Sequence, residues 1–151
     1  MSNELEALIL YIEMEAIRFE NSFTYNINID PNVEVDYIEI PSLIIQPYVE
    51  NSIWNGLMHK KDGIRKIDIN VQQNSNILLV TIEDNGIGRE ASHSFKRKNK
   101  EKHKSFGMNI TKERLDYINK KYGIQTNINI DDLIDDSGNS LGTRVNIKIG
   151  L

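Results

Sequence analysis

The sequence contains no cysteine, only three prolines and a single tryptophan. Without cysteine the chain forms no disulfides and no thiolate metal sites, and a reducing compartment is permitted. No apolar run approaches the roughly 18 residues that a transmembrane helix needs, and the N-terminus lacks the basic-then-apolar pattern of a signal peptide. We therefore expect the chain as given to be soluble.

An excess of positive charge is also missing. The formal net charge of -4 argues against a general nucleic-acid binder, and the aromatic interleaving of a base-stacking surface is nearly absent. A chain of 151 residues that is 39% hydrophobic and 26% charged suits one compact domain with a sizeable core. We therefore expect a single domain over residues 1–151, without internal repeats.

The first half of the chain contains two helical patterns. Apolar residues at helical spacing predict an amphipathic helix over residues 4–20. The segments FTYNINID and YIEI are expected to be extended. After the turn signal Pro41-Ser42, residues 43–60 are expected to form a second helix, with Pro47 bending its first turns.

The second half is richer in strands. KIDINVQ and ILLVTIED alternate in polarity and predict a hairpin. Residues 87–106 lack apolar periodicity and are expected to form a loop, followed by a helix over 107–122 and the strands TNINI and TRVNIKI. Strands beside helices without regular alternation favour an α+β fold, with a mixed sheet and helices on one face.

The stretch VTIEDNGIGRE, residues 80–90, allows two interpretations. Asn85-Gly86 is a preferred pair for a type I′ hairpin turn, but no second strand follows it. Gly86 and Gly88 are better explained by a backbone with positive φ, or by a ligand that approaches where a Cβ would collide. Asp84 then places a carboxylate, which only accepts hydrogen bonds, at the floor of the opening, where it suits a ligand that presents an amino group, such as adenine.

The segment QPYVENSIWNG supplies a second set of polar side chains. On a helix Asn51 and Asn55 share a face, while Val49, Ile53 and Leu57 lie on an apolar side that can pack on the sheet. An amide carbonyl is a hard oxygen ligand of the kind that Mg²⁺ prefers. Taken alone, Asn51 is equally well explained as a solvated helix residue.

Together the segments QPYVENSIWNG, EDNGIG, SFGMNITKERL and GTRVNIKI resemble, in order and spacing, the nucleotide-binding boxes of the GHKL ATPase superfamily. The chain most closely resembles the catalytic and ATP-binding domain of LytS/YehU-like sensor histidine kinases. YIEMEAIRFENSFTYNINID resembles the segment that follows the phosphoacceptor helices in this group, so residues 1–22 are expected to be a helical link to them. The resemblance implies a two-layer α/β sandwich with a mostly antiparallel sheet and a mobile ATP lid over about 87–106.

The resemblance also implies roles for individual residues, with ATP and Mg²⁺ as the ligands. Asn51 would coordinate Mg²⁺, Asp84 would bind the adenine amine, Thr143 would line the base pocket, and Glu50 would assist the reaction. The remaining nucleotide-binding residues implied are Asn55, Gly86, Gly88, Gly107 and Met108. Any one of the lid cations Lys96, Arg97, Lys98, Lys100, Lys102 and Lys104 is more often a solvated residue than a phosphate contact.

Two departures from the group stand out. Trp54-Asn55 occupy the place of a usual Lys-His pair, so a cationic phosphate contact is missing or comes from His59, Lys60 or Lys61. Ile110 occupies the place of a usual asparagine in the second glycine box. Nucleotide binding is therefore better supported than efficient turnover.

The chain has no Pro-His-Phe stretch of the kind that carries the phosphoacceptor histidine in this group. We expect the acceptor on a separate helical domain of a longer, membrane-anchored kinase, with this chain as a cytoplasmic domain, a response regulator downstream and no nucleic-acid partner. The chain alone is expected to be monomeric or weakly associated. The alternatives are an anti-sigma-type serine kinase and a non-catalytic nucleotide-sensing module.

Overall fold

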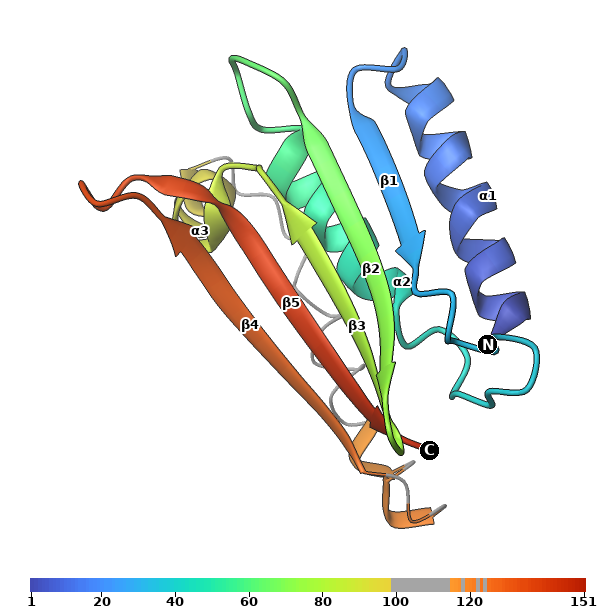
Figure 1. Ribbon diagram of the computed structural model, residues 1–151. Helices are drawn as coiled ribbons and strands as arrows, with labels where there is room; N and C mark the ends of the chain where they lie inside the picture. Colours follow the sequence, from blue (N-terminus) through green and yellow to red (C-terminus); the bar gives the residue numbers. More distant parts are fainter. Residues whose placement is uncertain (99–114, 118, 122, 124) are drawn as a thin grey trace.

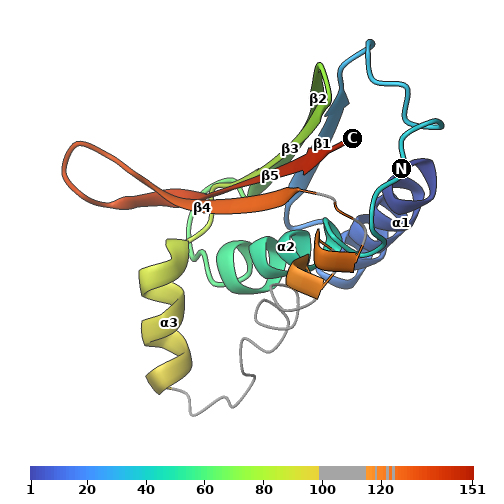
Figure 2. The ribbon, with the colours of Figure 1, turned by 90° about the horizontal axis from the view of Figure 1, so that it is seen from below.

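A computed structural model of the chain describes residues 1–98, 115–117, 119–121, 123 and 125–151. It contains one sheet with helices on one of its faces (Figures 1 and 2). The elements in chain order are α1 (Ser2–Arg18), β1 (Thr24–Ile29), α2 (Gln46–Asn51), the π-helix η1 (Ser52–Leu57), β2 (Lys66–Asn74), β3 (Ile77–Asp84), α3 (Gly88–Lys98), β4 (Thr126–Ile134) and β5 (Ser140–Gly150). Residues 115–117 and 119–121 are also helical.

The sheet is mixed and mostly antiparallel. Its strand order is β1-β2-β3-β5-β4, and the β1–β2 pair is parallel while the other three pairs are antiparallel. The parallel pair is connected through α2 and η1, as a parallel connection requires a crossover. The predicted α+β fold class and the predicted hairpin of β2 and β3 are thus confirmed.

The core lies between the sheet and the helices α1, α2 and η1. The inward positions of β2, β3 and β5 alternate with polar outward positions such as Asp68, Thr81 and Asn146, the pattern of a sheet with one solvated face. The largest fully buried side chains are Leu8, Ile12, Ile44, Ile45, Ile53, Leu57, Ile67, Ile69, Leu78, Ile82, Ile147 and Ile149. The apolar helix side predicted from Val49, Ile53 and Leu57 therefore packs in the core.

Three predicted elements differ in the structure. The YIEI segment is not a strand. The side chains of Val33 and Ile38 are buried in the core, and backbone hydrogen bonds such as the one from the Tyr37 N–H to the Glu34 carbonyl form turns. The second helix begins at Gln46, because Pro47 is tolerated in a first turn but not further inside. The expected loop 87–106 is wrong for Gly88–Lys98, which is helical.

Among the described residues, no helix combines the length and the apolar character needed to span a membrane.

Candidate functional site

Asp84 is the last residue of β3, and only 2% of its surface is exposed. Its Oδ1 accepts a hydrogen bond from the backbone N–H of Gly86 at 2.9 Å, and the Ser52 hydroxyl and the Thr143 N–H also donate to the carboxyl. Burial, the largest influence, raises the pKa of Asp84 to about 6, while these donors oppose the rise. At neutral pH the site therefore holds a buried carboxylate.

Close contacts between backbone segments surround this carboxylate. A Cβ built on Gly56 of η1 would lie 2.8 Å from Asp84 Oδ1, and one on Gly86 would lie 2.4 Å from the carbonyl carbon of Gly56. Gly142 of β5 has φ +132°, and a Cβ there would lie 1.8 Å from the Asp84 carbonyl oxygen. No side chain fits between η1, β3 and β5 at this point, so glycine is required on all three sides of Asp84.

The two glycines singled out in the sequence have different reasons to be glycine. Gly88 has φ +76°, as expected, and begins α3. Gly86 is not among the residues with positive φ; the protein's own Gly56 backbone occupies the space of its missing side chain. Sequence reasoning did not single out Gly56, Ser52 or Gly142. All three lie inside the quoted motifs QPYVENSIWNG and GTRVNIKI, but sequence reasoning gave none of them a role.

Asn51 and Asn55 face each other, as predicted. The Asn55 Nδ2 donates to the Asn51 Oδ1 at 2.6 Å, and both side chains are half-buried. On the preceding turn Gln46 Nε2 donates to Glu50 Oε1 at 2.8 Å, which orients that carboxylate along the helix. Ser52 and Gly56, the neighbours of Asn51 and Asn55 in the chain, both contact Asp84, so the same two turns carry the amide pair and touch the carboxylate.

The amide pair suits a magnesium ligand. The Asn51 Oδ1 retains a second lone pair after accepting from Asn55, and Mg²⁺ is commonly held by one or two protein oxygens together with phosphate and water. Within the part of the chain that the structure describes, no group of three or more His, Cys, Asp or Glu residues is arranged to hold a metal. The role of Asn51 as a metal ligand remains a prediction.

Asn85 is a structural residue that the sequence did not reveal. Its Oδ1 accepts from the Lys66 N–H and its Nδ2 donates to the Ile64 carbonyl, both at 2.8 Å. Its own carbonyl accepts from the Lys60 ammonium, also at 2.8 Å. Asn85 therefore ties the segment after β3 to the segment before β2. The chain then continues into α3, which rules out the hairpin interpretation of Asn85-Gly86.

A bidentate ion pair connects the start of α3 to β4. The Arg89 Nε and Nη2 donate to the two carboxylate oxygens of Asp132 at 2.9 and 2.7 Å. The hydrogen bond from Arg89 lowers the pKa of Asp132.

Residues 99–106 of the predicted lid lie outside the described residues, as do the side chains of residues 96–98, so the roles of the lid cations stay predictions. The same holds for Gly107, Met108 and Ile110.

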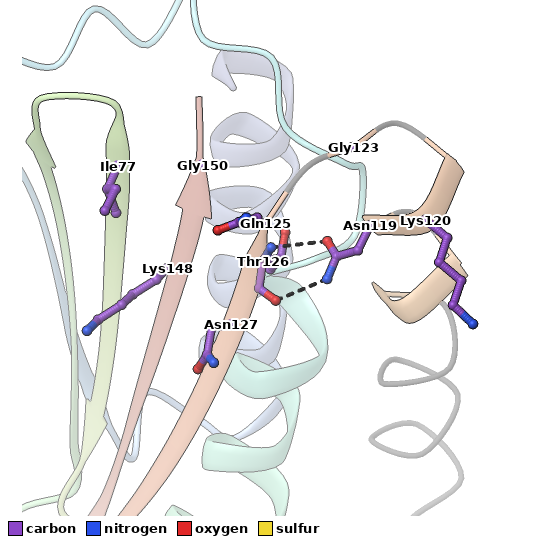
Figure 3. A pocket seen from close by; sticks show the side chains of 9 residues that line it. All are labelled: Ile77, Asn119, Lys120, Gly123, Gln125, Thr126, Asn127, Lys148 and Gly150. Atoms are coloured by element: carbon purple, nitrogen blue, oxygen red, sulfur yellow. Dashed lines mark hydrogen bonds between the residues drawn. The ribbon is translucent and has the colours of Figure 1, made fainter.

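Two of the hollows on the described surface lie at opposite ends of β3. One of about 300 Å³ is lined by Asp84, Asn85, Glu83 and Arg144 among others. The other, of about 640 Å³, is lined by Ile77 and Gly150, where β3 begins and β5 ends, and Figure 3 shows Asn119 bonded in both directions to the Thr126 backbone beside it. The smaller hollow includes Glu83 and Arg144, which lie on the outward face of the sheet, so neither hollow by itself marks the site. We place the candidate site at the Asp84 end of β3, because that end holds a buried carboxylate enclosed by glycines.

Comparison with known proteins gives sensor proteins among the relatives. The chain is 37% identical over 94 residues to the sensor protein LytS of Oceanobacillus iheyensis, and 28% identical over 126 residues to the sensor histidine kinase BtsS of Escherichia coli K12. These matches cover 60% and 82% of this chain but only 15% and 20% of those proteins. No protein-family model matches the chain.

Solved structures show the same fold at low sequence identity. The catalytic domain of the histidine kinase ThkA has a TM-score of 0.58 at 12% identity, over 99% of this chain and 92% of that one. The mycobacterial sensor histidine kinase MprB has a TM-score of 0.57 at 16% identity, over 97% and 93%. The fold is therefore that of a histidine kinase catalytic domain. In fold and in sequence the chain is therefore similar to the catalytic domains of LytS-like sensor histidine kinases.

Proposed function

We propose that the chain binds Mg-ATP and, within a longer kinase, donates the γ-phosphoryl group to a histidine on a separate helical phosphoacceptor domain. A response regulator would receive the group downstream. The observation that carries the proposal is the buried Asp84 carboxylate, enclosed by Gly56, Gly86 and Gly142 and next to the turns of the Asn51–Asn55 pair. The names of the relatives, sensor protein LytS and sensor histidine kinase BtsS, support it.

The described residues fit the two ends of the nucleotide. The Asp84 carboxylate would accept from the adenine amine, with Thr143, Gly86 and Gly88 around the base. At the other end the Asn51 and Asn55 amides would meet the Mg²⁺-bound phosphates, and Glu50 would hold a water or a proton. Bound Mg²⁺ neutralises triphosphate charge, which together with positioning is most of what phosphoryl transfer requires. Gly107 and Met108 keep their proposed phosphate-side role from the sequence alone.

The acceptor and the location belong to the proposal as well. His59 follows η1, while His93 and His103 belong to the lid segment, and we propose none of the three as the acceptor. We propose that the chain is the cytoplasmic part of a membrane-anchored kinase, and that alone it is monomeric or weakly associated. Sedimentation at micromolar concentration tests the last point, since a tight dimer would contradict it.

One observation favours a second candidate, a non-catalytic nucleotide-sensing module. Trp54, which replaces a lysine usual in the group, packs against α1, and the Lys60 ammonium is bonded to the Asn85 carbonyl. Neither supplies a cation for the phosphates in this arrangement. The serine kinase alternative is not favoured, because the named relatives are sensor histidine kinases.

The test is a calorimetric titration of a non-hydrolysable ATP analogue into the chain, with Mg²⁺ and with a chelator. Asp84→Asn should abolish binding, while Asn51→Ala should remove only the gain from Mg²⁺. No binding by the unchanged chain at millimolar nucleotide would refute the proposal. Binding without phosphotransfer from ATP to a supplied LytS-type phosphoacceptor domain would favour the non-catalytic module.

A further inference from the structure

Trp54, the only tryptophan, joins η1 to α1 through three different contacts. Its ring lies edge-to-face with Phe19, with centroids 5.0 Å apart and planes at 73°. The Arg18 guanidinium lies 4.7 Å from the ring centroid, within the range of a cation–π contact. Tyr11 shares a side-chain hydrogen bond with Trp54, in which the indole N–H must be the donor because indole has no acceptor.

The α1 helix also holds the other end of the same helical segment. Ile45, the N-cap of α2, has no side chain that can accept a hydrogen bond. Glu4 of α1 instead holds the chain where it enters the helix: its carboxylate accepts from the backbone N–H groups of Leu43, Ile44 and Ile45 at 2.7, 3.1 and 3.3 Å. A negative charge at this end also suits the helix dipole. Contacts from α1 thus fix the α2–η1 segment at its start and at Trp54.

The residues that follow Trp54 lead directly to the candidate site. Asn55 donates to the Asn51 Oδ1 at 2.6 Å, and Gly56 contacts the Asp84 carboxylate. Trp54 therefore contacts α1, Asn55 contacts the proposed metal ligand Asn51, and Gly56 contacts the Asp84 carboxylate. Only one peptide bond separates Trp54 from Asn55, so a displacement of the indole also displaces the Asn55 backbone.

The local backbone makes this segment sensitive to such a displacement. Residues Ser52–Leu57 form a π-helix, and the Met58 N–H still bonds the Ile53 carbonyl in the wider π pattern at 3.0 Å. A π turn is rare, appears frequently at functional sites, and differs by one residue in its hydrogen-bond pattern from an α-helix such as α2, which precedes it here. The side-chain contacts of Trp54 with α1 are therefore well placed to decide which of the two forms the segment adopts.

We propose that Trp54 is a positioning residue through which α1 sets the geometry of the Asn51–Asn55 pair, and with it the gain in nucleotide affinity that Mg²⁺ provides. The inference rests on the proposed nucleotide binding at this site. Asp84, which would hold the adenine end, lies at the end of β3 and touches the Trp54 segment only through Gly56. Loosening α1 from Trp54 then lowers the affinity for Mg-nucleotide and leaves the affinity for metal-free nucleotide nearly unchanged.

The test uses two conservative variants. Trp54→Phe keeps a ring for Phe19 and Arg18 but loses the indole N–H, and Tyr11→Phe loses the acceptor of that bond. The chain and its variants are titrated by calorimetry with a non-hydrolysable ATP analogue, in Mg²⁺ and in chelator. We expect each variant to lower the ratio of the two affinities by roughly threefold to tenfold, the range of one lost hydrogen bond. Tyr37→Phe, at a tyrosine that is 84% exposed, is the matched control and should leave the ratio unchanged.

Tryptophan fluorescence, excited selectively over tyrosine, gives a second readout that needs no variant of Trp54 itself, since all tryptophan emission comes from this residue. Mg-nucleotide should shift the emission of the unchanged chain, and Asn55→Ala should abolish the shift while nucleotide still binds in chelator.

The outcomes separate the inference from the proposed function. If the unchanged chain binds Mg-nucleotide but Trp54→Phe and Tyr11→Phe keep the full Mg²⁺ gain, the inference is wrong and the proposed function stands. Equal losses in Mg²⁺ and in chelator would mean that the contacts only stabilise the fold, which also overturns the inference. No binding by the unchanged chain overturns the proposed function, and the inference with it.

Discussion

Gly56 and Asp84 are in direct contact, and a Cβ built on Gly56 would stand 2.8 Å from the Asp84 Oδ1. The two residues come from different elements, since Gly56 belongs to η1 and Asp84 ends β3. The carboxylate is therefore held between the helical layer and the sheet, and any side chain at position 56 must displace it.

This contact predicts the sign of a Gly56→Ala substitution. Alanine in a helix interior is usually more stable than glycine by about 1 kcal/mol. Here the added methyl group meets a buried carboxylate, and overpacking of this kind costs about 1 to 3 kcal/mol. We expect a net loss in the free energy of unfolding in urea, together with weaker nucleotide binding. Gly150→Ala is the control, because its nearest neighbour would lie at an ordinary 3.5 Å; a Gly56→Ala protein more stable than the unchanged chain would contradict the close contact.

A second prediction concerns the cost of ionising Asp84. Burial raises its pKa from 3.8 to about 6, so between these values the folded chain holds a proton that the unfolded chain has lost. Stability therefore falls as the pH rises from about 4 to about 6 and is then constant. The shift of roughly two units corresponds to about 3 kcal/mol.

Asp84→Asn removes this charge and keeps an acceptor for the Gly86 N–H. We expect its free energy of unfolding at pH 8 to exceed that of the unchanged chain by about 1 to 3 kcal/mol, with no gain near pH 4. Urea denaturation at pH 4 and pH 8 measures this difference in stability, with Asp136→Asn at an exposed position as the control. A gain of the same size at both pH values would mean that ionisation is not its cause.

The same pKa predicts how nucleotide affinity depends on pH. Only the ionised carboxylate can accept from the adenine amine without a competing proton. Affinity should be constant above about pH 7 and decrease about tenfold for each pH unit well below 6, as protonation competes with the ligand. Titrations between pH 5 and 8 measure this, and an affinity that is flat over that range would exclude Asp84 as the base-binding group.

Sequence reasoning reached the parts of this molecule that depend on local pattern. Alternating polarity predicted β2 and β3, helical spacing predicted α1, and the order of the motifs brought Asp84 and Thr143 together, which pair in adjacent strands. It also predicted that Asn51 and Asn55 share a face, because residues four apart on a helix do so.

What the sequence did not reveal depends on contacts between distant segments. Gly86 is glycine because Gly56, 30 positions earlier, lies against it, and nothing local at either position encodes that contact. In the sequence Trp54 is only a departure from a motif. Its partners Tyr11, Arg18 and Phe19 lie on α1 or at its C-terminal end, more than 30 residues away, so the sequence did not reveal these contacts. The helix α3 was missed because its sequence, GREASHSFKRK, is mostly polar and lacks an apolar stripe.

The fourth prediction concerns Asn85, which connects the segment after β3 to the segment before β2. Asn85→Ala removes the hydrogen bonds to the Lys66 N–H and the Ile64 carbonyl, and we expect a loss of about 0.5 to 1.5 kcal/mol in stability, because both bonds are exposed and water can replace the amide. Asn85→Asp keeps the acceptor but sets a carboxylate against a carbonyl oxygen, so it should not restore stability. Asn28→Ala, which removes one exposed amide bond to Asn70, is the matched control and should change stability by less than about 0.5 kcal/mol.

The last prediction concerns the Arg89–Asp132 pair that joins α3 to β4. Both side chains are partly exposed, at 39% and 42%, and pairs of this kind usually contribute about 0 to 1 kcal/mol despite good geometry. A double-mutant cycle with Arg89→Gln and Asp132→Asn should therefore give a coupling energy below about 1 kcal/mol that shrinks with added salt. The Arg144–Glu83 pair has similar exposure, and its hydrogen bond runs from the Arg144 Nε to one Glu83 oxygen at 2.8 Å, so its coupling should be smaller still. A coupling well above 1 kcal/mol that resists salt would show that the start of α3 is fixed far more firmly to the sheet than this exposure implies.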